Sequence, residues 1–333
     1  MSGLGRALRA TAVACLALAC EVGAEPGAEP GARLLAPGVI STPGNEFSGT
    51  MTPDGREIYF SRSVPRSYMY AIFVSRRVEG RWTRPELAPF SGHGRDFDPV
   101  LSPDGKRLVF ISDRPVTPGV PHHDYDIWMV ERTAGGGWSE PRNLGAPANT
   151  EKPAGERGWG QNEWFASLAA DGTLYVSSDG YEPGRTQIYA LRWIDGRYQK
   201  PENLGPAING DGLENGEPII APDQSFLLFS GYGRKGGYGG WDVYISRHRP
   251  DGTWSEPENL GPAVNTSARD YSPRLEPDGH TLVFTSERNF ATGRKTPVTW
   301  AELSAGLASL LNGNGNLYEI DLCSLKLKSF PCP

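Results

Sequence analysis

Short apolar segments alternate with polar positions along most of the chain, and five of them follow a tight turn of nearly the same sequence. Three of these turns read Pro-Asp-Gly, one begins with Ala170 and one ends with Gln224. Proline presets φ, aspartate bonds back to its own backbone and glycine takes a positive φ, so each copy predicts the turn of a β-hairpin. Gln224 lacks the freedom of glycine, which predicts a strained turn or a turn of another type. The turns occupy 53–55, 103–105, 170–172, 222–224 and 277–279.

Two further segments follow most of these hairpins. One is an apolar third strand, and the other is a more polar fourth segment that reads Trp-Ser-Glu-Pro-Arg-Asn-Leu-Gly or Trp-Ser-Glu-Pro-Glu-Asn-Leu-Gly in its clearest copies. A four-strand unit that recurs about every 50 to 70 residues is typical of one blade of a β-propeller. The pattern therefore predicts an all-β propeller of five four-stranded blades, with six blades as the alternative. The expected third strands are 71–74, 126–129, 187–190, 242–245 and 317–320.

The two ends of the repeat region indicate how the ring closes. The fifth copy has no fourth segment after Leu322, whereas residues 32–38 resemble that segment at the start of the region. Because an isolated blade cannot bury its own faces, we expect 32–38 to pair with the last blade. The expected propeller covers 32–333, with blades at roughly 46–93, 94–151, 160–212, 214–268 and 269–333.

One segment of the last blade departs from the strand pattern. Thr299 and Glu302 have the spacing of a capping box, and apolar residues follow at helical spacing until Asn312-Gly313. We expect a short helix between the second and third strands of this blade, packed on the propeller by its apolar side chains. Those side chains are Trp300, Leu303, Leu307, Leu310 and Leu311.

The motifs of the second blade suggest a family. The runs Ser-Pro-Asp-Gly-Lys-Arg-Leu-Val-Phe at 102–110, Asp-Ile-Trp at 126–128 and Trp-Ser-Glu-Pro-Arg-Asn-Leu-Gly at 138–145 resemble the WD40-like propeller repeat of the periplasmic TolB type. The resemblance covers roughly residue 32 to the C-terminus and implies association with the cell envelope. The family includes scaffold proteins, peptide and glycan binders, and modules fused to peptidases, so the resemblance leaves the ligand open.

The N-terminal segment predicts export. Arg6 and Arg9 precede a short apolar stretch, and the small residues 22–24 suit cleavage by a signal peptidase, so 1–24 is expected to be a signal peptide. Cys20 follows Ala-Leu-Ala, which leaves a lipoprotein signal open as the alternative. Residues 25–31 are low in complexity and are expected to form a disordered tether. We therefore expect a periplasmic protein, or an outer-membrane or surface lipoprotein if Cys20 carries lipid.

The composition of the chain limits the kinds of partner that the protein is expected to bind. The net charge of −6 argues against nucleic acid, since a phosphate binder needs a basic face. No apolar run after the N-terminal segment is long enough for a transmembrane helix, and we expect a monomer. Cys323 and Cys332 remain after processing, and export would allow them to form a disulfide that closes a short C-terminal loop. Two buried free thiols are the alternative.

Acidic residues recur at one position of the repeat, eight residues before the turn aspartate. In a propeller this position is expected at the mouth of the central channel, and in the fourth copy it holds Asn215, with Glu217 nearby. Carboxylates around one axis repel each other unless something compensates. Ion pairs with Arg95 and Arg269, a bound Ca²⁺, or a cationic or polyhydroxyl ligand could do so. The residues considered as Ca²⁺ ligands are Glu46, Asp96, Glu163, Glu217 and Asp270.

Aromatic residues accompany these carboxylates. Phe47, Phe97, Trp164 and Tyr271 each follow the acidic position directly, and the loop between the second and third strands of the fourth copy ends in Trp241. Such a combination of aromatic, arginine and loop residues is typical of a recognition surface. The expected ligand-binding residues are Glu46, Arg95, Asp96, Glu163, Trp164, Glu217, Trp241, Arg269, Asp270 and Tyr271.

Two functions are consistent with this pattern. The first is a non-catalytic binding or scaffold module of the envelope, with a protein, peptide or glycan held at the channel face. The second is a five-bladed glycoside hydrolase, which needs one protonated and one ionised carboxylate. Its candidate acids are Glu46, Asp96, Glu163, Glu217 and Asp270. A serine hydrolase is not favoured, because the chain has no Gly-x-Ser-x-Gly motif and only five histidines.

Overall fold

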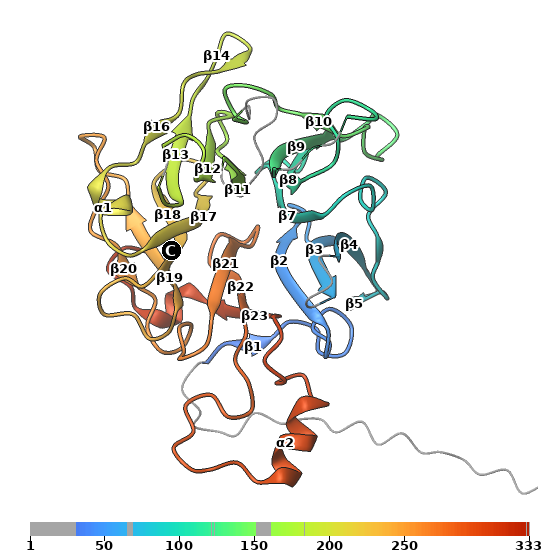
Figure 1. Cartoon of the computed structure of the whole chain (residues 1–333), viewed down its shortest axis with the longest axis vertical. Coiled ribbons are helices and arrows are strands. Elements are labelled where there is room, and N and C mark those ends of the chain that lie inside the picture. Colours follow the sequence, from blue (N-terminus) through green and yellow to red (C-terminus); the bar gives the residue numbers. More distant parts are fainter. Residues whose placement is uncertain are drawn as a thin grey trace, which may run out of the picture.

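The computed structural model describes residues 31–64, 69–120, 122, 124–150, 161–182, 184–330 and 332. The expected signal peptide, Cys20 and most of the expected tether lie outside these residues. Five antiparallel sheets are arranged around a central axis, as Figure 1 shows, so the prediction of a five-bladed β-propeller is confirmed.

Each blade begins with its innermost strand and continues outward. The first blade contains β2 (Asn45–Met51), β3 (Glu57–Val64), β4 (Met69–Val78) and β6 (Glu86–Leu87), and the short β5 (Arg81–Trp82) also pairs with β4. The second contains β7 (Asp96–Leu101), β8 (Arg107–Ser112), β9 (Asp126–Glu131) and β10 (Arg142–Asn143). The third contains β11 (Glu163–Leu168), β12 (Leu174–Ser178), β13 (Gln187–Leu191) and β16 (Glu202–Asn203), with a separate hairpin of β14 (Trp193–Ile194) and β15 (Arg197–Tyr198). The fourth contains β17 (Glu214–Ile220), β18 (Phe226–Tyr232), β19 (Trp241–Arg247) and β20 (Glu258–Asn259).

The last blade is completed by the N-terminal strand, as expected. It contains β21 (Asp270–Leu275), β22 (Thr281–Ser286) and β23 (Asn316–Asp321), and β1 (Arg33–Leu34) pairs with β23 in antiparallel register. The Arg33 guanidinium lies 2.7 Å from the Glu319 carboxylate across this pair. The ring is therefore closed by strand pairing between its first and last segments. The 3₁₀ turn η1 (Leu322–Leu325) follows β23, and Cys323 within this turn forms a disulfide with Cys332.

Apolar side chains from neighbouring blades pack against each other and hold the ring together. Between the first two blades, the Phe90 ring stacks on Tyr59 and lies against Phe110 and Trp138, at centroid distances of 5.4 to 6.2 Å. The Pro-Asp-Gly turns adopt the expected positive φ at glycine. Gln224 takes φ 61° in the fourth turn, so the prediction of a strained turn there is confirmed.

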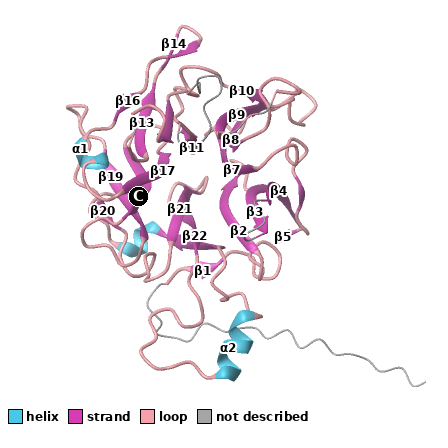
Figure 2. Ribbon diagram, viewed as in Figure 1, coloured by secondary structure: helices cyan, strands magenta, loops and turns pink. Residues whose placement is uncertain are grey.

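The inserted helix is shorter and more exposed than expected. The helix α2 (Trp300–Leu307) begins with the predicted capping box of Thr299 and Glu302, but it ends before Leu310. Figures 1 and 2 show α2 outside the ring, and Trp300 keeps 79% of its surface exposed. The prediction that its apolar side chains pack on the propeller is wrong for Trp300, Leu303 and Leu307, because the helix is instead anchored through Gly306, which lies directly against the Phe290 ring. The only other α-helix among the described residues is the four-residue α1 (Pro206–Asn209).

Irregularities in the inner strands shape the channel. A register shift interrupts the pairing of each inner strand with its neighbour, shortly after the strand begins. In four blades a residue at this β-bulge has a positive φ of 48° to 56°, which turns the strand locally. These residues are Ser48, Asp98, Glu217 and Ser272. No helix of the described residues has the length and apolarity needed to cross a membrane.

Candidate functional site

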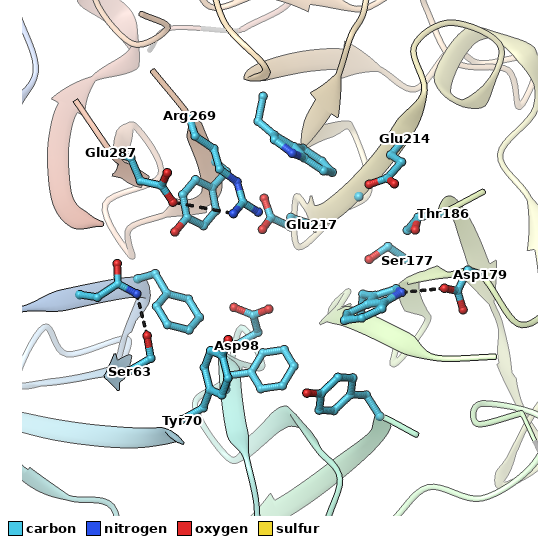
Figure 3. A pocket seen from close by; sticks show the side chains of 18 residues that line it. Ser63, Tyr70, Asp98, Ser177, Asp179, Thr186, Glu214, Glu217, Arg269 and Glu287 are labelled. Carbon is cyan, nitrogen blue, oxygen red and sulfur yellow. Dashed lines mark hydrogen bonds and ion pairs between the residues drawn. The ribbon is translucent and has the colours of Figure 1, made fainter. Parts of the chain in front are cut away.

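A cavity of about 490 Å³ opens at the channel face, where the inner strands begin, and all five blades contribute to it. We call it the channel-face pocket. Its lining, drawn in Figure 3, consists of Asn45, Phe47, Ser63, Tyr70, Phe97, Asp98, Tyr125, Trp164, Ser177, Asp179, Thr186, Glu214, Gly216, Glu217, Trp241, Arg269, Tyr271 and Glu287.

Five aromatic rings form one continuous side of this pocket, which we call the aromatic wall. The contacts run from Phe47 to Tyr70 at a centroid distance of 6.2 Å, from Tyr70 to Phe97 at 5.5 Å, and on to Tyr125 at 5.0 Å. Tyr125 then meets Trp164 at 5.3 Å. Since the wall crosses from the first blade to the third, its rings hold each other in place and present a preformed apolar surface.

Arg269 occupies the opposite side of the pocket. Its guanidinium lies 4.1 Å from the centre of the Tyr271 ring and 5.5 Å from that of Trp241. It also lies 3.7 Å from the Glu287 carboxylate, as Figure 3 shows. This arrangement is a cation held by aromatic faces and one carboxylate, and the protein forms it with its own side chain.

Two carboxylates, Asp98 and Glu217, lie at the centre of the pocket, and we call them the acidic pair (Figure 3). The bulge serines connect them. Ser48 Oγ donates to Asp98, and it lies 2.9 Å from Ser272 Oγ. Ser272 donates to Glu217 through its backbone N–H at 2.7 Å and its hydroxyl at 2.9 Å. Burial and the negative charge of Glu217 raise the pKa of Asp98 to about 7.

A buried arginine lies close to the acidic pair. Arg274 is only 3% exposed, and its guanidinium lies 4.4 Å from the centre of the Phe165 ring. Its Nη1 donates to the carbonyl of Pro273 at 2.7 Å, whereas Nε and Nη2 have no hydrogen-bond partner among the described residues. Burial lowers the pKa of Arg274 to about 10, and the charges of Asp98 and Glu217 act in the opposite direction. The acidic pair is thus partly balanced by a cation that does not line the pocket.

Half of the ligand-binding residues expected from sequence line this pocket. They are Trp164, Glu217, Trp241, Arg269 and Tyr271. Arg95 does not line it, because it pairs with Asp113 at 2.6 Å and covers the Tyr125 ring at 5.1 Å. Four of the expected carboxylates do not line the pocket either, so the prediction of a ring of acids at the channel mouth is wrong for these four residues. They are Glu46, Asp96, Glu163 and Asp270.

These four carboxylates are fully buried and have hydrogen-bond partners inside the protein. Asp96 accepts from Arg114 at 2.6 Å, and Asp270 accepts from Arg288 at 3.2 Å. Glu46 accepts from Arg62 at 2.9 Å, whereas Glu163 takes its hydrogen bonds from Thr150 and Ser178, and burial raises the pKa of Glu163 well above its usual range.

The alternation of side chains along a strand explains the difference. Asn45 and Phe47 line the pocket, so Glu46 between them lies on the other face of β2. The part of the chain that the structure describes contains no group of three or more His, Cys, Asp or Glu residues placed to hold a metal ion. The five residues considered as Ca²⁺ ligands are therefore not brought together.

Sequence reasoning missed Asp98, which lies two residues after the expected acid. Strict alternation would place it beside Asp96, but the bulge, where Asp98 has φ 52°, turns it into the pocket instead. A signal for this was present. Asp98, Glu217 and Ser272 each precede a proline, and proline within a central strand indicates a bulge. The pocket residues Asp179 and Glu287, and the buried Arg274, carried no comparable signal.

Comparison with known proteins supports the fold. No protein-family model matches the chain, and no curated protein matches its sequence. Among solved structures, one described as a glycoside hydrolase aligns with a TM-score of 0.54 at 10% identity, over 91% of this chain and 92% of that one.

Two TolB-type structures align with lower TM-scores. TolB from Acinetobacter baumannii aligns at 0.45 and 14% identity, over 84% of this chain and 55% of its own. The putative TolB from Agrobacterium tumefaciens aligns at 0.44 and 20% identity, over 74% of this chain and 71% of its own. The chain thus spans about half of the first TolB protein. The similarity to the glycoside hydrolase structure, at 10% identity, concerns the fold alone.

Proposed function

We propose that this chain is a non-catalytic binding module of the cell envelope that holds part of a protein, peptide or glycan ligand in the channel-face pocket. The observation that carries the proposal is the pocket itself. It is concave, it is lined by aromatic side chains, and it presents a few polar groups from every blade. Such a composition is typical of binding sites. The envelope location rests on the predicted signal peptide and on the resemblance to TolB-type repeats.

The hydrogen bonding of the buried carboxylates favours binding over catalysis. Four of the five acids considered for glycoside hydrolysis are enclosed in the protein and accept hydrogen bonds from its own donors. A catalytic acid or base must reach the substrate. These four side chains are therefore assigned to the stability of the blades.

Thermal unfolding with a ligand panel tests the proposal. Peptidoglycan fragments, envelope-derived peptides and neutral oligosaccharides are added to the wild-type chain and to Trp164→Ala. A ligand at 100 times its dissociation constant stabilises the folded state by about 2.7 kcal/mol, which raises the melting temperature by several degrees. We expect at least one ligand to do so in the wild type and not in Trp164→Ala. Trp300→Ala is the matched control, since Trp300 lies on the exposed helix away from the pocket. An equal shift in Trp164→Ala would contradict the proposal.

A second candidate function, glycoside hydrolysis, is favoured by the acidic pair. Asp98 and Glu217 both line the pocket, and the pKa of Asp98, raised to about 7, is suited to a general acid. Turnover of chromogenic glycosides by the wild type, lost in Glu217→Gln, would establish this function. Binding of oligosaccharides without turnover would support the binding module instead.

A further inference from the structure

We propose that the channel-face pocket selects a ligand through a single protruding cationic group of a peptide, a lysine ammonium or an arginine guanidinium, which is held between the aromatic wall and the acidic pair. This inference rests on the proposed function, because it names the chemistry that the same pocket would recognise.

The channel-face pocket has more acidic than basic side chains in its lining. Five acidic side chains line it against one guanidinium, that of Arg269, and of these five Asp98 is partly protonated near pH 7. Arg269 is already paired with Glu287, and Arg274 offsets one further charge from outside the lining. Asp98 and Glu217 take their hydrogen bonds from serine donors, and neither forms an ion pair with a described Lys, Arg or His residue. A cationic ligand would supply the missing counter-charge.

The aromatic side chains of the pocket also favour a cationic ligand. Aromatic faces attract cations, and two arginines of this protein already lie over aromatic rings of the pocket. Arg269 lies over Tyr271 and Trp241, and Arg95 lies over Tyr125 from outside the pocket. The remaining wall, with Phe47, Phe97 and Trp164, lines the same pocket as the acidic pair. A ligand cation entering there would meet ring faces and carboxylates together.

The lining of the pocket also contains a buried hydroxyl group, that of Ser177, which could accept a hydrogen bond from a ligand. Ser177 lines the pocket, and only 1% of the surface of this residue is exposed. Its Oγ has no hydrogen-bond partner among the described residues. A Cβ placed on Gly216, which also lines the pocket, would lie 3.6 Å from this Oγ and 3.9 Å from the Thr186 methyl carbon, and Figure 3 draws Ser177 and Thr186 in the lining. An ammonium or guanidinium carries only donors, so the hydroxyl oxygen would serve it as an acceptor.

A pair of peptides tests the inference. The probe is the blocked pentapeptide Gly-Gly-Lys-Gly-Gly, and the matched probe has norleucine in place of lysine, which keeps the aliphatic chain and removes the charge. Binding is measured by tryptophan fluorescence and calorimetry up to millimolar concentration. We expect the lysine peptide to bind on the order of tenfold more tightly than the norleucine peptide, as a partly desolvated cation over aromatic rings would.

Two variants separate local recognition from the overall charge of the protein. Glu217→Gln and Glu140→Gln each remove one negative charge, but Glu140 is an exposed residue that does not line the pocket. Glu217→Gln should reduce the preference for lysine to near unity, and Glu140→Gln should leave it unchanged. An unchanged melting temperature and circular dichroism spectrum would show that Glu217→Gln is folded.

The outcomes distinguish the two levels of the proposal. Equal binding of both peptides, or no binding of either, would overturn the cation inference. If neutral oligosaccharides or the norleucine peptide then bind in a manner that depends on Trp164, the proposed binding function stands without it. If no member of either panel binds at the pocket, both the inference and the proposed function fail.

Discussion

Asp98→Asn should make the protein less sensitive to alkaline pH. Asp98 is buried at the base of the channel-face pocket, where it interacts with Glu217 of the fourth blade, with Arg269 and Arg274 of the fifth blade, and with Ser48. Burial and the charge of Glu217 raise its pKa to about 7. The folded protein therefore holds a proton that the unfolded chain releases near its ordinary carboxyl pKa of about 4. The stability gained from this proton is complete below that value and is lost as the pH rises through about 7.

The size of the effect follows from the two pKa values. One pKa unit corresponds to about 1.4 kcal/mol, so the wild type should lose about 2 to 3 kcal/mol of unfolding free energy through Asp98 between pH 5 and pH 8. Asparagine cannot ionise, it keeps the oxygen that accepts from Ser48, and it tolerates the positive φ of this position better than most residues. The unfolding free energy of Asp98→Asn relative to wild type should thus rise by about 2 to 3 kcal/mol over this interval.

Urea unfolding at pH 5, 6, 7 and 8 measures this difference. Other titrating groups are common to both proteins and largely cancel. Asp104→Asn is the control from the same blade. The hydrogen bonds of its carboxylate from Ser102 and the Lys106 backbone lower the Asp104 pKa, so its pH-dependent contribution is lost only below about pH 4. Its effect should be constant from pH 5 to 8. Parallel pH curves for wild type and Asp98→Asn would refute the reasoning.

Three further predictions concern stability, each measured as the free energy of unfolding in urea. Gln224→Ala should lower the free energy of unfolding by about 1 to 2 kcal/mol, because the variant keeps the positive φ and loses two hydrogen bonds to the third blade. Gln224→Gly should recover most of this loss. An alanine variant as stable as the wild type would contradict this prediction. Gly306→Ala should lower the free energy of unfolding by about 1 to 3 kcal/mol and make the segment that contains α2 more sensitive to proteases, since a methyl group at this position overlaps the Phe290 ring. Unchanged stability together with unchanged cleavage would contradict this packing. Reduction of the Cys323–Cys332 disulfide, whose cysteines are nine residues apart, should lower the free energy of unfolding by about 2 to 3 kcal/mol, because the unfolded chain gains conformational freedom. No change under reductant would show that the disulfide does not constrain the unfolded chain.

The architecture was accessible from sequence because its signals are local. A turn aspartate, followed by glycine in four of the five copies, indicates each hairpin, and the spacing of the copies indicates the number of blades. The pairing of 32–38 with the last blade followed from a missing segment at one end and a spare one at the other. The exposure of Trp300 could not be predicted this way. A capping box and helical spacing predict a helix, but they do not tell which surface the helix will contact.

The site was only partly accessible, for a reason that lies in one backbone feature. The aromatic residues Phe47, Phe97, Trp164 and Tyr271 all line the pocket, as the pattern suggested. The carboxylates that directly precede them point the other way, since neighbouring side chains of a strand lie on opposite faces. The bulge then brings in Asp98, which strict alternation would have placed outside. A bulge changes the face of the strand on which a side chain lies, but it leaves the spacing of the repeats unchanged. The position of Asp98 therefore could not be found by counting residues alone.

Fluorine NMR of the chain labelled with 5-fluorotryptophan tests most directly whether the channel-face pocket is the ligand site. The nine tryptophans would be assigned through single Trp-to-Phe variants, and the labelled chain titrated with the lysine pentapeptide and with cell-wall oligosaccharides. Trp164 and Trp241 line the pocket, whereas Trp300 lies on the exposed helix outside the ring. We predict saturable shifts of the Trp164 and Trp241 resonances with Trp300 unchanged. Saturable binding that shifts Trp300 and leaves both pocket tryptophans unchanged would contradict the account.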